Sequence, residues 1–215
     1  MGVDLSSSVV IEDGMRGFAE GYSSRPVYFY CSRSTVEPDR SNTREILGCI
    51  ARQLSSQSPE HPLSTTTTEH YERRALEGSS RRSKPSMEEC RQLIVKLTEQ
   101  YPLTTIVVDA LDECDVETRG DLVEALETIL ADSASLVKVF VTSREEGDLR
   151  FLLQTHPRIQ VTPNENGPDI QTFVNFETDR LVAKNQLLAT IKIKPTKDEL
   201  KTLIKADVIA KAGSM

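Results

Sequence analysis

The sequence has little glycine and little proline, 10 residues of each among 215, which excludes a collagen-like or a low-complexity chain. It also has no apolar run near the roughly 18–20 residues that cross a bilayer, so it predicts no membrane span. Its first residues include acidic side chains and no basic stretch before a short apolar run. That order argues against a secretory signal.

An excess of positive charge is missing too. Lysine and arginine number 26 against 33 aspartate and glutamate residues, a net charge of −7, which argues against a dedicated nucleic-acid binder. The 3 histidines lie in polar segments and the 4 cysteines are far apart, so no zinc-ligand pattern is present. We expect free thiols in a reducing, cytoplasmic setting, with a single disulfide as the alternative. The cysteines are Cys31, Cys49, Cys90 and Cys114.

Short apolar runs alternate with segments of helical periodicity. Residues 27–31, 105–108 and 137–142 are nearly continuous apolar stretches, typical of buried strands, and residues 159–161 predict a last short strand. A chain of this length can bury a sizeable core without disulfides or metal. The alternation predicts an α/β fold with a parallel sheet and helices on both faces.

Three helix starts can be predicted from capping residues. Thr43 is placed to cap a helix before a periodic apolar segment. Ser86 with Glu89 forms a capping box, in which the serine oxygen accepts a free amide and the glutamate reaches back. Thr196 with Glu199 forms a second one.

The chain changes character twice along its length. Residues 56–85 are rich in proline, serine and threonine and predict a surface excursion with a short helix around residues 71–76. After residue 167 no strand is evident, and Asp169 is placed to cap a helix. We therefore expect an α/β domain over residues 1–167 and a small helical extension over residues 168–215.

An acidic cluster directly follows the strand at residues 105–108. It contains Asp109, Asp112, Glu113 and Asp115. Ligands of open α/β sheets bind at the carboxyl ends of strands, where one carboxylate can hold Mg²⁺ and another can orient water. The alternative is a polar turn whose carboxylates cap the next helix. The spacing alone leaves both interpretations open.

A hydroxyl and a guanidinium follow the next strand. Ser143 and Arg144 come directly after Thr142, at the same edge of the predicted sheet. Arginine suits phosphate because its planar fork donates two hydrogen bonds. A capping serine beside a surface arginine is the alternative. Together with the acidic cluster, this pair fits a nucleoside triphosphate with Mg²⁺.

Several segments carry a resemblance to a known family. They read, in order, VYFYCSR, REILGCIARQL, TTIVVDALDECD, VKVFVTSREEGDL and IQVTPNENGPDIQTFV. This order resembles fungal NACHT-type modules, which are P-loop nucleoside triphosphatases of the STAND signalling class and are often described as nephrocystin-like N-terminal domains. The resemblance covers roughly residues 5–213 and implies Mg²⁺ with ATP or GTP.

The resemblance also implies residue roles. Asp109 would be the Walker B acid that holds Mg²⁺, Asp112 and Glu113 would orient the hydrolytic water, and Arg144 would sense the γ-phosphate. Larger members of such families carry an effector domain before the module and repeats after it. The charge balance and the lack of a long apolar run predict no nucleic-acid or membrane partner.

One part of the family pattern is missing. A P-loop needs GxxxxGK[ST], but none of the 10 glycines is followed by lysine. Residues 5–13 match the helix that follows the P-loop, so we expect a truncated chain whose first strand and phosphate loop lie outside it. A degenerate relative and a different magnesium chemistry are the alternatives. Hydrolysis by this chain is then doubtful, and a non-catalytic interaction module that self-associates is the second hypothesis.

Overall fold

The computed structural model describes residues 5–56, 62–77, 83–160, 163–184, 186–187 and 196–212. The chain divides into two compact units, Met1–Thr155 and His156–Met215, which we describe one at a time. The domain division that the sequence predicts at residue 167 stays a prediction.

The first unit is built on a three-stranded parallel sheet in the order β1-β2-β3. The strands are β1 (Val27–Tyr30), β2 (Leu103–Asp109) and β3 (Leu136–Val141). In the register, Ile106 of the central strand lies between Val27 and Val139. The expected α/β class with a parallel sheet is therefore confirmed.

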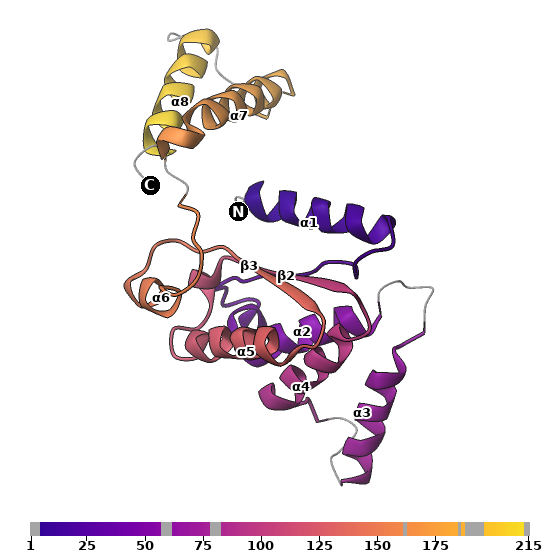
Figure 1. The fold of residues 1–215 in the computed structure, drawn as a ribbon. Coiled ribbons are helices and arrows are strands. Elements are labelled where there is room, and N and C mark those ends of the chain that lie inside the picture. The colour runs from indigo at the N-terminus through magenta and orange to yellow at the C-terminus, as the bar shows by residue number, and fades with distance from the viewer. Residues whose placement is uncertain are drawn as a thin grey trace. The chain divides into compact units, whose positions relative to one another are not determined.

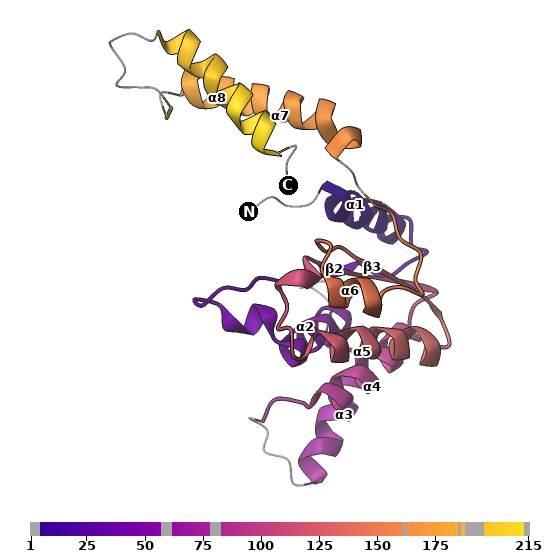
Figure 2. The same cartoon turned by 90° about the vertical axis from the view of Figure 1, so that its left-hand side faces the viewer.

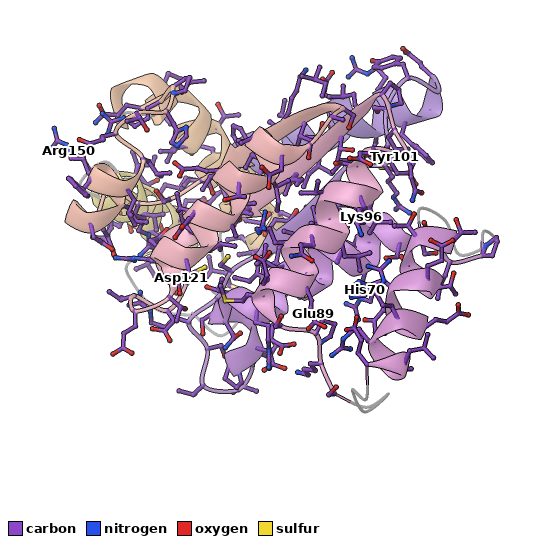
Figure 3. The ribbon with its side chains drawn as sticks, turned by 60° about the horizontal axis from the view of Figure 1, so that its bottom comes forward. His70, Glu89, Lys96, Tyr101, Asp121 and Arg150 are labelled. Carbon is purple, nitrogen blue, oxygen red and sulfur yellow. The ribbon has the colours of Figure 1, made fainter. Side chains whose placement is uncertain are left out.

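Helices lie on both faces of this sheet (Figures 1 and 2). On one face lie α2, α4 and α5, while α1 crosses the other face and packs against β2. Figure 3 shows α3, α4 and α5 from below, with Glu89 on α4 and Asp121 on α5. The helical segments of this unit are α1 (Leu5–Ala19), η1 (Pro38–Ser41), α2 (Thr43–Ser55), α3 (Thr65–Leu76), α4 (Met87–Thr98), η2 (Leu111–Glu113), α5 (Arg119–Asp132) and α6 (Gly147–Leu152).

The core lies between the sheet and the layer of α2, α4 and α5. Apolar residues at helical spacing on α2 and α4 are fully buried there, together with alternate residues of β2. Val107, on the opposite face of β2, is buried as well, although it does not belong to that cluster. The central strand is therefore buried on both faces, which explains its continuous apolar run. The fully buried core includes Ile46, Leu47, Ile50, Leu54, Ile94, Leu97, Ile106, Val108, Leu122 and Ile129.

The outer edge of β1 is closed by side chains. The carboxamide of Gln53 accepts the Tyr28 amide at 3.1 Å and donates to the Tyr28 carbonyl at 2.8 Å. It thereby pairs with β1 as the peptide group of a further strand would. The guanidinium of Arg40 donates to the Tyr30 carbonyl at 2.9 Å. Such pairing protects an edge strand from association with another chain.

The outer edge of β3 is open within the described part of the chain. The Thr142 amide donates to the Val108 carbonyl at 3.0 Å, so the backbone N–H and C=O groups of every second residue, counted back from Thr142, face β2. The N–H and C=O groups of the residues between them, Val137, Val139 and Val141, point away from the sheet. No hydrogen bond of the described residues reaches them. Outward backbone groups of β1 therefore have hydrogen-bond partners, while those of β3 have none among the described residues.

Both predicted capping boxes are confirmed. Ser86 accepts the Glu89 amide at 3.1 Å while Glu89 accepts the Ser86 amide at 2.6 Å. Thr196 and Glu199 make the same reciprocal pair. The prediction of Thr43 as a cap is wrong by one residue, because Asn42 accepts two amides of the first turn of α2.

Other predicted boundaries are also corrected. The helix in the excursion over residues 56–85 begins at Thr65, so α3 is twice as long as residues 71–76 suggested. Residues 159–160 form no strand, and Ile159 is 89% exposed, because no sheet partner reaches it; residue 161 lies outside the described residues. Within the described residues, β3 is the last strand. Asp169 does not begin a helix, since α7 already starts at Pro163.

The second unit pairs α7 (Pro163–Ala183) with α8 (Lys197–Ala212). Asp179 of α7 lies 2.8 Å from the Lys201 ammonium and 2.6 Å from that of Lys205. Hydrogen bonds from both lysines lower the pKa of Asp179. The helical character expected after residue 167 is thus seen in both described helices. Across the described residues, no helix is long and apolar enough to cross a membrane.

We expect the core to tolerate no cavity at Ile94, a fully buried residue of α4. Ile94→Ala should lower the free energy of unfolding by about 2–5 kcal/mol, because it removes buried methyl groups and leaves a void. Leu76→Ala is the matched control at a residue that is 88% exposed, and it should change stability by less than about 0.5 kcal/mol. Chemical denaturation measures both. Equal effects would contradict the assigned core.

Candidate functional site at the carboxyl edge of the sheet

Three loops meet where the parallel strands end. Parallel strands bring their carboxyl ends to one edge of a sheet, so the segments after β1, β2 and β3 are neighbours. Hydrogen bonds join Arg33, after β1, to the turn after β2, and the same turn to Arg144, after β3. The sequence predicted this meeting for the second and third loops.

Asp109 ends β2 and is the buried centre of this edge. Its Oδ1 accepts a hydrogen bond from the Thr142 hydroxyl at 2.7 Å and another from the hydroxyl of Ser7 on α1. Its carbonyl accepts the Cys31 amide at 2.9 Å, which continues the pairing of β1 with β2. A buried carboxylate needs such donors. Burial without a hydrogen bond costs roughly 2–7 kcal/mol even for an uncharged polar group, and more for an ionised carboxylate. Asp109 thus connects three elements of the fold.

A left-handed residue turns the chain directly after Asp109. Ala110 has φ 57° and ψ 55°, a conformation that costs a residue with a Cβ roughly 1–2 kcal/mol. The turn is held by the Thr142 hydroxyl, which accepts the Ala110 amide at 3.0 Å, and by the Thr142 carbonyl, which accepts the Leu111 amide at 2.8 Å. Thr142 therefore fixes both Asp109 and the turn that follows it.

The next two acids are held by backbone amides. Asp112 is buried, and its Oδ1 accepts the Arg144 amide at 3.0 Å. Glu113 accepts the Arg33 amide at 3.1 Å, while the Arg33 guanidinium donates to the Asp112 carbonyl at 2.7 Å. The side-chain nitrogen of Arg144 is 3.8 Å from Asp112, and the Arg144 side chain is 84% exposed. The acids are therefore oriented, while the Arg144 charge faces solvent.

Arg119 pairs with two acids that follow β3. This fully buried guanidinium lies 2.7 Å from Glu146, and its Nε is 2.6 Å from Asp148. Burial opposes the charge on Arg119, but its hydrogen bonds to Asp148 and Glu146 outweigh burial and raise its pKa. The same hydrogen bond lowers the pKa of Asp148. This group joins the start of α5 to the loop after β3.

Two cysteines lie beneath the turn. The sulfurs of Cys31 and Cys114 are 3.3 Å apart, and both side chains are buried. The hydrogen bond between the two thiols and their burial raise the pKa of Cys31 above its ordinary value. All 4 cysteines are free thiols in this structure.

The structure brings together four of the five predicted site residues: Asp109, Asp112, Glu113 and Arg144. Ser143 is exposed, and the hydroxyl that reaches Asp109 belongs to Thr142. Asp115 is exposed and accepts the Glu117 amide at 3.1 Å, so it acts as part of a turn.

Sequence reasoning missed three residues that donate hydrogen bonds at this edge: Ser7, Arg33 and Arg119. Ser7 is 102 positions from Asp109, and no local pattern connects them. Arg119 had a weak signal, because its apolar neighbours on α5 place it on the buried side of that helix. Among the described residues, no three histidine, cysteine, aspartate or glutamate side chains gather in a way that could hold a metal ion.

The fold and this edge define a parallel α/β domain with a carboxylate turn fixed by hydroxyls, amides and arginines. Residues 5–144 match the family described as nephrocystin 3, N-terminal. The chain therefore belongs to the nephrocystin 3 N-terminal family, as the nephrocystin-like part of the resemblance anticipated. No curated protein and no solved structure matches the chain.

We expect Thr142 to be needed for the geometry of the turn. Thr142→Val keeps the shape but removes the donor to Asp109 and the acceptor of the Ala110 amide. It should lower the free energy of unfolding by about 1.5–3 kcal/mol, because a charged partner and a backbone amide lose their bonds. Thr142→Ser retains the hydroxyl and should recover most of that loss. Denaturant titration tests both, and equal destabilisation by the two variants would contradict the assigned bonds.

Proposed function

We propose that this chain is the α/β part of a nucleoside-triphosphate-dependent signalling module of the NACHT type, within the STAND class of P-loop proteins. The observation that carries the proposal is the meeting of Asp109, Thr142 and Arg144 at the carboxyl edge of a parallel sheet. Ligands of open α/β sheets bind at this edge. A carboxylate for a cation and a guanidinium for a phosphate are what such a ligand requires.

Asp109 fits a magnesium position. Mg²⁺ takes one or two carboxylates from a protein and completes its shell with water and phosphate oxygens. A single protein carboxylate therefore suffices, and no three-residue metal cluster is needed. Both hydroxyl bonds to Asp109 reach Oδ1, so Oδ2 takes no part in these two bonds. The ion, when bound, would offset the charge of the phosphates.

Asp112, Glu113 and Arg144 fit the remaining roles. Backbone amides hold the two carboxylates in place, so either one can accept a hydrogen bond from a water and orient it. The exposed guanidinium of Arg144 is able to donate two hydrogen bonds to a phosphate. These residues would position and sense the terminal phosphate.

The phosphate cradle of a P-loop has no counterpart in this sequence. None of its 10 glycines is followed by lysine, so neither the lysine nor the glycine-rich amide nest is available to the phosphates. We propose that this chain binds nucleotide weakly and does not turn it over.

Nucleotide binding tests the proposal. Fluorescent ATP and GTP analogues are titrated into the purified chain with and without Mg²⁺. We expect saturable, Mg²⁺-dependent binding that Asp109→Asn weakens at least roughly 10–100-fold, the loss that removal of a residue behind a metal ligand already causes. Asparagine keeps a side-chain oxygen that can accept the Ser7 and Thr142 hydroxyls, so the fold should persist. Circular dichroism checks this.

Asp121→Asn is the matched control for the same change of charge. Asp121 is an exposed residue of α5 (Figure 3). The Asp121→Asn variant should bind the nucleotide analogues as tightly as the unmodified chain does. Absence of binding to folded protein would retire the nucleotide proposal, and turnover above buffer would contradict the inactivity of this chain.

A non-catalytic interaction module is the second candidate function. Two observations favour it: protein groups already satisfy the acids of the turn, and the β3 edge carries outward backbone groups at Val137, Val139 and Val141 without partners among the described residues. An open edge is a template for pairing with another strand. Self-association through β3 follows from this candidate.

Sedimentation velocity over a wide concentration range tests self-association. We expect the average mass to rise with concentration. Val139→Pro should reduce that rise, because it removes an outward N–H without removing a bond to β2. A chain that stays monomeric throughout would contradict this candidate and leave the nucleotide test untouched.

A further inference from the structure

Cys31 and Cys114 form a close pair that the proposed nucleotide chemistry does not use. They are 83 positions apart in the chain, yet their sulfurs are 3.3 Å from each other. Cys31 is 6% exposed and Cys114 is fully buried. No other two of the free cysteines are recorded in contact within the described residues, so proximity singles out this pair.

Each cysteine occupies a fixed position next to the acidic turn. The Cys31 amide donates to the Asp109 carbonyl at 2.9 Å, directly after β1. The Cys114 amide donates to the Leu111 carbonyl at 3.1 Å and closes η2, the segment that holds Asp112 and Glu113. The backbone beside both sulfurs is thus held by bonds, which keeps the two side chains facing each other.

A disulfide needs little movement from this arrangement. A sulfur–sulfur bond is about 2.05 Å long, so the two atoms must approach by a little over an ångström. Rotation about the two side-chain bonds with a small backbone shift provides such a change. We propose that Cys31 and Cys114 are a redox-modification site. A reversible disulfide forms between their two sulfurs, and a small disulfide such as glutathione disulfide is the oxidant.

The exchange proceeds in two balanced steps. Cys31, the more exposed of the two, gives its proton to solvent, and its sulfur attacks the small disulfide; because the pKa of this thiol is raised, the step is slow at neutral pH. A mixed disulfide forms and one small thiol leaves. Cys114 then loses its proton and attacks the Cys31 sulfur, which releases the second small thiol. The protein loses two hydrogens and two electrons, and the small disulfide gains them.

The bond would tie the end of β1 to the acidic turn. This covalent link closes a loop of 83 positions, so it restricts the unfolded chain strongly. We expect the thermal midpoint to rise by roughly 5–10 °C in the oxidised form. A pair of thiols that only fills space would show no such gain.

The test uses the folded, full chain. It is equilibrated with defined ratios of reduced and oxidised glutathione, quenched in acid, alkylated and digested. Mass spectrometry should find a peptide that joins Cys31 to Cys114, lacking two hydrogens, which disappears on reduction. Cys90→Ser is the matched control, since Cys90 is also buried, and this variant should form the same cross-link.

Cys31→Ser and Cys114→Ser should each abolish the cross-link and the thermal shift. If either variant fails to fold, the redox titration of the unmodified chain still decides. Three results would overturn the proposal: both thiols stay free at every ratio, oxidation stops at a glutathione adduct, or the disulfide forms only in urea or with another cysteine.

Discussion

The buried carboxylate of Asp109 is the constraint on which the carboxyl edge of this domain depends. A carboxylate inside a protein needs hydrogen-bond donors, and here these come from elements far apart in sequence: Ser7 on α1 and Thr142 after β3. Satisfying one side chain therefore fixes the position of the N-terminal helix, the end of the central strand and the start of the next loop. The left-handed turn at Ala110 is stabilised by the same threonine.

Charge around this centre is compensated by the protein itself. Arg33 and Arg144 contribute amides to Glu113 and Asp112, and Arg119 binds the acids of the loop after β3. The turn is therefore ordered before any ligand arrives. In the function proposed above, Mg²⁺ would join these carboxylates to a phosphate and the exposed Arg144 would bind it directly, with little reorganisation of the protein. The same compensation lets the turn persist as a purely structural feature, which is why binding must be measured.

Local patterns predicted the parts of the fold that local physics decides. The apolar run of β2 is continuous because that strand is buried on both faces, and the reciprocal pairs at Ser86 and Thr196 require only residues three positions apart. Contacts between distant segments were beyond such patterns. No pattern near Ser7 predicts its contact with Asp109, and no pattern near Cys31 predicts its contact with Cys114. Ile159 and Gln160 begin an alternating segment that resembles a strand, but a strand exists only where a neighbour pairs with it.

A double-mutant cycle between Ser7 and Asp109 tests the central constraint most directly. The free energy of unfolding is measured for the unmodified chain, Ser7→Ala, Asp109→Ala, which removes the accepting oxygen, and the double variant. If the hydroxyl bond ties α1 to the sheet, the two changes are coupled by about 1–3 kcal/mol, as bonds to charged groups are. Additivity within about 0.5 kcal/mol would contradict the assignment, because independent sites add to that precision.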